Sequence, residues 1–69
     1  MNESEKQWFL SLPAEMKLNL LDDMLKEEKF MMALETAKIL LDAPLSEGGI
    51  SSEDIDKVFD KNLKLNDQD

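Results

Sequence analysis

Residues 30–41 (FMMALETAKILL) constrain the fold more than any other segment of this chain. Glu35, Thr36 and Lys38 interrupt nine apolar side chains. A helix of this composition carries apolar residues on more than one face, so it is either buried on several sides or available to a partner. The whole chain has 69 residues, which leaves little protein to cover such a helix. We therefore expect this segment to take part in binding.

The length and the absence of cysteine limit how the chain can be stabilised. A chain of 69 residues provides one domain, and a domain of this size buries only about 60% of the surface that its unfolded chain exposes. Disulfides are excluded, and the absence of both cysteine and histidine disfavours transition-metal sites. Oligomerisation or a partner chain is the remaining aid, and a compact monomer is the alternative.

The charge restricts the class of partner. Sixteen acidic residues stand against eight lysines, and the chain has no arginine, so its net charge is −8. Such a surface repels phosphate backbones, and bidentate phosphate contacts are made by arginine. We therefore expect no direct nucleic-acid binding, whereas a basic protein partner fits. Because lysines are interleaved with the acidic residues throughout, the charge also fits a well-solvated surface.

The first residues and the apolar runs predict a cytoplasmic protein. The opening MNESEKQ lacks the basic and apolar regions of a secretory signal. The longest wholly apolar run has five residues, from Phe30 to Leu34, and a membrane-spanning helix needs far more.

Capping and proline signals predict the first two helices. Ser4 and Gln7 form a capping-box pattern, which would start a helix at about residues 5–11. Pro13 disfavours a helical conformation at the residue before it and is well tolerated in a first helical turn, so a second helix is expected over 13–27. Its apolar residues span an arc of roughly 200°, which predicts a central helix with neighbours on both flanks.

The phase of the apolar residues separates the second helix from a third at 30–41. The linking residues 26–29 contain neither glycine nor proline, so one continuous helix over 13–41 is an alternative. In a continuous helix, Phe30 would lie roughly 320° from Met16, on the polar side. A turn in the link removes this mismatch, and we therefore expect an antiparallel hairpin of two helices.

A loop and a strong start signal predict the last helix. One proline and a pair of glycines mark residues 42–49 as a loop. Ser51 then stands at an N-cap position, and Ile50 can pack against Ile55 as a hydrophobic staple. A helix is expected over 52–64. Its apolar stripe consists of Ile55, Val58, Phe59 and Leu63.

These elements predict an all-α fold, a small three- to four-helix bundle built around the central antiparallel hairpin. We expect a single helical domain over residues 1–65 and a disordered tail at 66–69. No low-complexity segment interrupts this arrangement.

Helical phasing divides the segment at 30–41 into two faces. The face toward the second helix is the expected core, and alanines on it would allow a close approach of the two helices. Met32 and Ile39 lie nearly opposite, with Met31 offset toward them. Either the terminal helices fold over this second face, or it is a homodimer seam or a partner groove, for which flexible methionine is well suited. The expected core face consists of Phe30, Ala33, Leu34, Ala37, Leu40 and Leu41.

The chemistry-bearing side chains predict no enzyme, no metal site and no cofactor. The chain has no histidine, cysteine, tyrosine or arginine, so acid–base catalysis would need carboxylates or lysines in a dry site for which a small bundle has little room. The glycine pair lacks the lysine and hydroxyl residue of a phosphate-binding loop. Asp54, Asp56 and Asp60 lack the arrangement of an EF-hand calcium loop, and a solvated helix surface explains them.

Several apolar residues of the expected hairpin fall in a known pattern. Leu20, Met24, Phe30, Ala33 and Leu34 occupy positions of packing residues in a tetratricopeptide repeat, and Pro44 lies close to its closing proline. Over residues 14–44 the chain therefore resembles one such repeat. It departs from the pattern at Leu21 and Glu28, where small residues or glycine are typical, and at Ala37, where an aromatic residue is usual. The resemblance implies protein or peptide binding, although one repeat cannot bury its own faces.

Together these patterns favour a small regulatory interaction protein, an adaptor or an inhibitor, that docks apolar helix surface onto another protein. The alternatives are an acidic nucleic-acid mimic that blocks a basic DNA- or RNA-binding protein, and a helical structural subunit of a larger assembly. A second copy of the chain is the other candidate partner. The residues expected to contact the partner are Trp8, Phe9, Met31, Met32 and Ile39.

Overall fold

The computed structural model describes residues 2–64, and these residues form helices without any strand. The all-α class and the small helical bundle are confirmed. The predicted tail at 66–69 lies outside the described residues. None of the helices in the described part is long and apolar enough to cross a membrane. The elements are α1 (Glu3–Leu10), α2 (Ala14–Lys26), α3 (Phe30–Asp42), the 3-10 turn η1 (Leu45–Glu47) and α4 (Ser52–Lys64).

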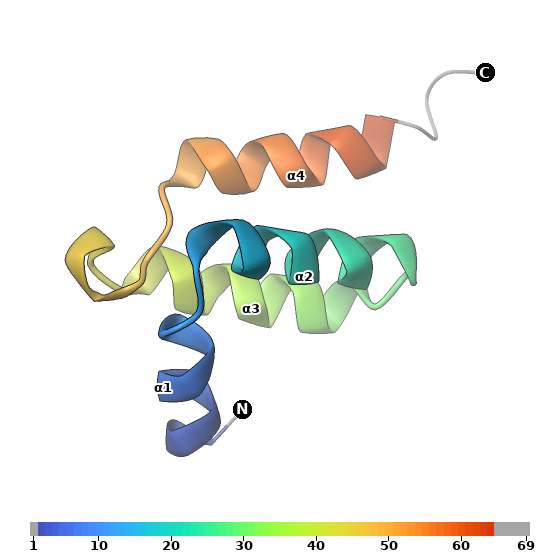
Figure 1. Ribbon diagram of the computed structural model, residues 1–69. Helices are drawn as coiled ribbons and strands as arrows, with labels where there is room; N and C mark the ends of the chain where they lie inside the picture. Colours follow the sequence, from blue (N-terminus) through green and yellow to red (C-terminus); the bar gives the residue numbers. More distant parts are fainter. Residues whose placement is uncertain (1, 65–69) are drawn as a thin grey trace.

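The second helix, α2, is the centre of the molecule. It packs against α3 and against α4, and these are the main contacts between helices in the described part of the chain. Figure 1 shows α3 returning antiparallel to α2, with α4 lying along the other flank of α2. Leu21 and Leu25 of α2 are accordingly buried. The predicted central helix with neighbours on both flanks is confirmed.

The predicted break between α2 and α3 is also confirmed, and Glu28 forms it. Its φ of 60° places it in the left-handed region, which costs a residue with a side chain roughly 1–2 kcal/mol. The backbone N–H of Lys29 donates to the carbonyl of Met24 over 2.8 Å, and that of Glu28 donates to Leu25 over 3.1 Å. These two hydrogen bonds make a Schellman motif, which ends α2 by satisfying its last carbonyls.

The N-terminal cap of α1 differs from the prediction. Asn2, not Ser4, is the N-cap: its Oδ1 accepts from the backbone N–H of Glu5 over 2.8 Å, and its own N–H donates to Glu5 Oε1 over 3.1 Å. Asparagine caps a helix as well as serine does, and a glutamate at the third position completes the reciprocal box. The helix therefore begins two residues earlier than predicted, and Gln7 instead donates to Glu3 over 3.2 Å.

A buried lysine joins α1, α2 and the loop before α4. Lys17 is only 2% exposed. Its Nζ donates to the carbonyl of Leu10 over 3.0 Å and also to the carbonyl of Gly48. Gly48 has φ 96°, and a Cβ added there would collide with the Leu10 carbonyl oxygen. A buried ammonium group is tolerated because polar acceptors surround it, and this contact fixes α1 at one end of the bundle.

The core lies between α2, α3 and α4 and includes one residue of α1. Ser51 caps α4 as predicted, accepting from the backbone N–H of Asp54 over 3.4 Å. Ile50 and Ile55, the predicted staple, are both buried. The buried apolar residues are Phe9, Leu21, Leu25, Ala33, Ala37, Leu40, Ile50 and Ile55.

The buried face of α3 is not the predicted one. Ala33, Ala37 and Leu40 are buried as expected, together with Thr36. Three large side chains of the expected core face, Phe30, Leu34 and Leu41, are between 46% and 56% exposed. The prediction for these three was wrong because the small residues of α3 face α2, which turns the buried arc by roughly 50° around the helix.

Candidate functional site

The third helix leaves most of its large apolar side chains in solvent. Among the large apolar residues at positions 30–41, those left 46–76% exposed are Phe30, Met31, Met32, Leu34 and Leu41. The exposure has a structural cause: α4 packs on α2 and makes few contacts with α3. α3 is therefore covered along one narrow arc only, and apolar side chains emerge on both sides of that arc.

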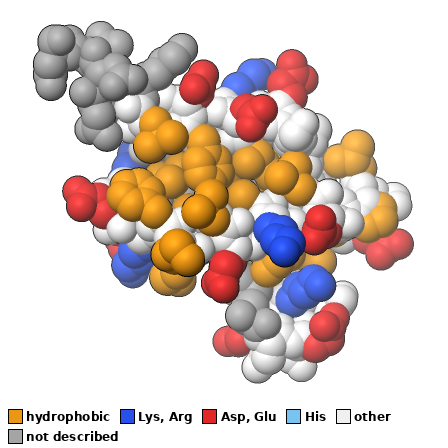
Figure 2. Space-filling view, turned by 180° about the vertical axis from the view of Figure 1, so that it is seen from behind, with side chains coloured by type: hydrophobic (Ala, Val, Ile, Leu, Met, Phe, Trp, Pro, Cys, Tyr) orange, Lys and Arg blue, Asp and Glu red, His pale blue; other side chains and the backbone are white. Residues whose placement is uncertain are grey.

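One apolar surface lies on the side of α3 that is turned toward α4. We call it the α3–α4 face and define it by Phe30, Leu34 and Leu41 of α3 and Phe59 and Leu63 of α4. Leu34 and Leu41 lie within about 40° of Phe30 around α3, so the three residues form one row. Figure 2 shows a contiguous central patch of hydrophobic side chains on this side of the molecule, with a few others near its edges.

Contacts with Asp22 set the rotation of α4 and so turn its apolar row toward this face. Asn62 donates through Nδ2 to Asp22 Oδ1 over 2.7 Å, and Lys61 Nζ lies 3.5 Å from the same oxygen. Phe59 and Leu63 lie about 60° and 100° around the helix from Asn62. Phe59 is partly buried against the core, while Leu63 is 47% exposed.

The contacts of the same carboxylate also shift its pKa. The hydrogen bond from Asn62, followed by the one from Lys26, holds the pKa of Asp22 below its ordinary value of 3.8. Lys26 Nζ lies 2.9 Å from Asp22 Oδ2, and this contact raises the pKa of Lys26. The contacts of Asn62 and Lys61 with Asp22 join α4 to α2, whereas the Lys26–Asp22 pair lies within α2.

An acidic edge borders the α3–α4 face along α4. We define it as Glu53, Asp56 and Asp60, which recur at spacings of three and four residues and lie within about 60° of one another on the helix. All three are exposed, and Figure 2 shows acidic side chains along the α4 side of the patch. Asp56 lies about 20° from Leu63 around α4, so this carboxylate directly adjoins the apolar row. On the opposite edge, formed by α3, Lys38 is exposed.

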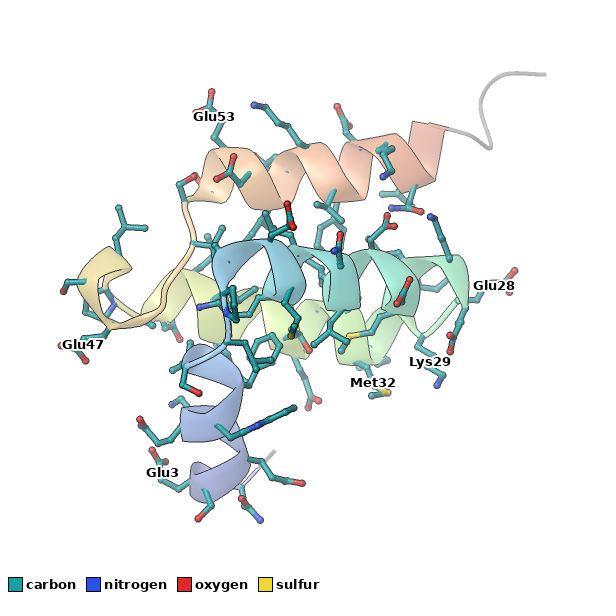
Figure 3. All side chains as sticks on the ribbon, in the orientation of Figure 1. Glu3, Glu28, Lys29, Met32, Glu47 and Glu53 are labelled. Atoms are coloured by element: carbon teal, nitrogen blue, oxygen red, sulfur yellow. The ribbon has the colours of Figure 1, made fainter. Side chains whose placement is uncertain are left out.

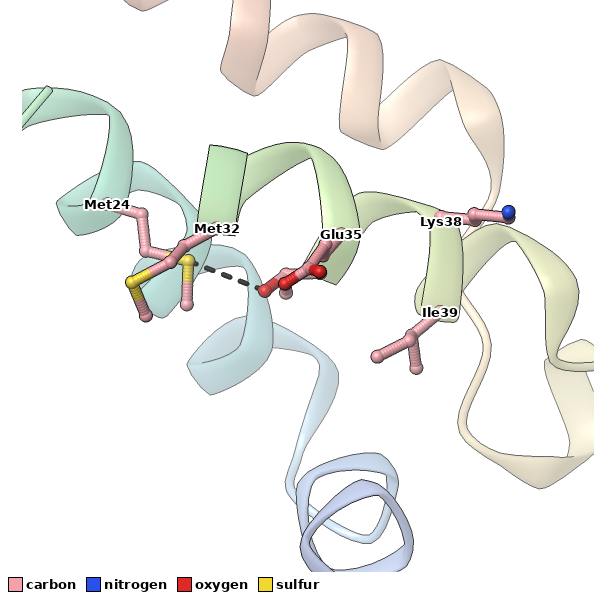
Figure 4. Close-up of a pocket in the computed structure, with 6 residues that line it drawn as sticks. Met24, Met32, Glu35, Lys38 and Ile39 are labelled. Atoms are coloured by element: carbon pink, nitrogen blue, oxygen red, sulfur yellow. Dashed lines mark hydrogen bonds between the residues drawn. The ribbon is translucent and has the colours of Figure 1, made fainter. Parts of the chain in front are cut away.

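A second apolar surface lies on the other side of α3. It is an open pocket of about 390 Å³ between α2 and α3 (Figure 4). Thr36 donates through Oγ1 to Met24 Sδ over 3.5 Å at its base. Figure 3 shows Met32 projecting from α3 on the side away from α4. The residues that line this methionine pocket are Met24, Met32, Glu35, Thr36, Lys38 and Ile39.

The structure brings together some of the predicted contact residues. Met32 and Ile39 share the methionine pocket, with Met32 49% exposed and Ile39 partly buried. Met31 is exposed on the outer side of α3, and Trp8 is exposed on α1. Phe9 is 2% exposed and belongs to the core, so its side chain is not available on the surface and the assignment of Phe9 as a contact residue was wrong.

The α3–α4 face was missed as a site because its residues were expected in the core. The alanines at 33 and 37 were the signal that could have found it. Two small residues four apart allow a close approach of two helices, and the bulky side chains beside them are then displaced to the flanks.

Residues 2–64 contain no group of three or more acidic side chains placed to hold a metal ion. Comparison with protein-family models, with curated proteins and with solved structures finds no match to this chain. The resemblance to a tetratricopeptide unit therefore stays a likeness of helical-hairpin pattern.

Proposed function

We propose that this chain is a small protein-binding module, an adaptor or an inhibitor, and that the exposed apolar surface of α3 is its contact surface. The observation that carries the proposal is the exposure of large apolar side chains along α3, from Phe30 to Leu41. Burial of apolar surface contributes roughly 25 cal/mol per Å², so covering these side chains with a partner is favourable.

The arrangement of the exposed residues supports this function. Apolar residues scattered singly on a surface are ordinary, whereas a contiguous patch marks an interaction site. Phe30, Leu34 and Leu41, all about half exposed, form one row on α3, and Leu63 adds an exposed apolar side chain on α4. Met31 and Met32 add flexible thioether side chains, which adapt to differently shaped partners.

The alternative of an acidic nucleic-acid mimic makes a different prediction at the same residues. A mimic binds its basic target through carboxylates, so the added carboxylate of Leu34→Asp would leave that binding unchanged or strengthen it. Binding through the apolar surface is lost in the same variant, because the substitution places a charge within a desolvated contact.

Affinity capture with the full chain from the cells that produce it tests the proposal. Leu34→Asp and Met32→Asp remove apolar contacts from the two sides of α3. Leu45→Asp is the matched control, because Leu45 is 71% exposed and lies outside α3. The expected result is a partner that is retained by the natural chain and by Leu45→Asp and lost with Leu34→Asp, at unchanged helicity. Equal retention by all variants would overturn the proposal.

A further inference from the structure

We infer that the segment bound by the α3–α4 face is an amphipathic α-helix of another protein that carries basic residues along one edge. This inference rests on the proposed function and adds the chemistry of the partner. Of the two apolar surfaces of α3, the one that binds this helix is the surface bordered by the acidic edge.

The geometry of the face matches the apolar side of a helix. Its row on α3 runs from Phe30 to Leu41, eleven residues along the axis, which corresponds to roughly 16 Å or three helical turns. Phe59 and Leu63 supply a second row on α4. A helix laid along these rows contacts them through apolar residues at spacings of three, four and seven.

The face is held in place before any partner arrives. Both rows stand on helices that pack against α2, whose Leu21 and Leu25 are buried beneath them. The Asn62–Asp22 hydrogen bond of 2.7 Å fixes the rotation of α4. A preformed surface of this kind loses little conformational freedom on binding.

The charges around the face determine the edge of the bound helix. Two carboxylates of the acidic edge, Glu53 and Asp56, border the face on the α4 side, and Lys38 lies on the α3 side. Lysine or arginine residues of the bound helix that point toward α4 therefore meet carboxylates. The net charge of −8 attracts such a helix from a distance as well.

The same charges argue against a second copy of this chain as the occupant. A second copy brings another eight negative charges and an identical acidic edge. Like charges brought together across an interface disfavour association. A protein of opposite charge is the occupant that fits both the apolar rows and the acidic edge.

A titration of the ¹⁵N-labelled chain with two synthetic helical peptides tests this inference. Both peptides carry the same leucines at helical spacing, and one has lysines along one flank where the other has glutamates. We expect the lysine peptide to bind at least about tenfold more tightly, with chemical-shift changes centred on Leu34, Leu41 and Leu63. Leu34→Asp should abolish this binding, while Leu45→Asp, at an exposed position outside α3, should preserve it.

Charge reversal at the acidic edge provides the sharper comparison. In a Glu53→Lys/Asp56→Lys variant, the preference should shift toward the glutamate peptide, because both positions are exposed and the apolar rows are unchanged. Light scattering on the same samples should give the mass of a monomer, 7.9 kDa, for the free chain. The inference would be overturned if the peptide preference did not change on charge reversal, or if the chemical-shift changes were centred on Met32 and Ile39. A dimer of the free chain that is abolished by Leu34→Asp would also overturn it.

The proposed function can survive that failure. If cellular capture depends on Leu34 but the peptides do not discriminate by charge, α3 is a protein-binding surface whose partner is of a different class. If neither capture nor the peptides depend on α3, both proposals fail.

Discussion

At the scale of single residues, Asp22 joins two helices that are far apart in the sequence. Its side chain is 13% exposed, and its oxygens lie within hydrogen-bonding or ion-pair distance of Asn62, Lys26 and Lys61. The Asn62 contact, and then the Lys26 contact, lower the pKa of Asp22. A carboxylate whose pKa is lower in the folded than in the unfolded chain stabilises the fold above the ordinary pKa, and this contribution is lost as the pH falls through the lowered value.

This linkage predicts the effect of Asp22→Asn on stability. The variant should unfold more easily than the natural chain at neutral pH, because Asn cannot provide the charged acceptor. The difference in the free energy of unfolding should shrink as the pH falls below 3.8, since Asp22 itself then becomes neutral. Urea unfolding at a series of pH values measures it. Asp23→Asn, at an exposed neighbouring position, is the control. A difference for Asp22→Asn that is constant from neutral to acidic pH would contradict the linkage.

At the scale of elements, the turn between α2 and α3 contains a strained backbone conformation that a single substitution should relieve. Glu28 adopts φ 60°, a conformation that glycine accepts without a steric cost. Glu28→Gly should therefore raise the free energy of unfolding by about 0.5–1 kcal/mol, after allowance for the greater freedom of glycine in the unfolded chain. Thermal and urea unfolding measure the change. Glu27→Gly, at a position with φ −90°, should give no stabilisation; a gain equal to that of Glu28→Gly would show that the left-handed turn is not the cause.

Substitutions on the buried and the exposed side of α3 should change the free energy of unfolding by different amounts. Leu40 is fully buried, so Leu40→Ala should lower the free energy of unfolding by about 2–4 kcal/mol. Leu34 is 56% exposed, so Leu34→Asp should change it by less than about 1 kcal/mol. Circular dichroism with urea unfolding distinguishes the two. If Leu34→Asp destabilises as much as Leu40→Ala, the α3–α4 face is part of the core in solution.

The helices could be predicted from the sequence more fully than their packing. Pro13 separated α1 from α2, the phase of Phe30 indicated the break before α3, and Ser51 marked the start of α4. These are local signals, and the cap at Asn2 was missed because two overlapping capping patterns compete there. Which face of α3 is buried depends on whether α4 packs against α2 or against α3. Helical periodicity contains no information about this choice.

At the scale of the whole molecule, the arrangement of three helices around α2 explains the candidate site. α4 and α3 occupy two flanks of α2 and share few contacts, so the chain buries its central helix and leaves the third one half covered. The positions of Met32 and Ile39, away from the expected core face of α3, could be predicted from their helical phase. The exposure of the larger row, Phe30, Leu34 and Leu41, was missed because large apolar residues toward one face ordinarily indicate core.

Site-specific photo-crosslinking in the cells that produce the chain tests the central claim most directly. A photoreactive amino acid replaces Leu34 in the α3–α4 face or, as the control, Leu45 in η1, which is also highly exposed. We expect a crosslink from position 34 to a basic segment of a different polypeptide, and no such product from position 45. Crosslinks from position 34 that join only copies of this chain, or the same products from both positions, would contradict it.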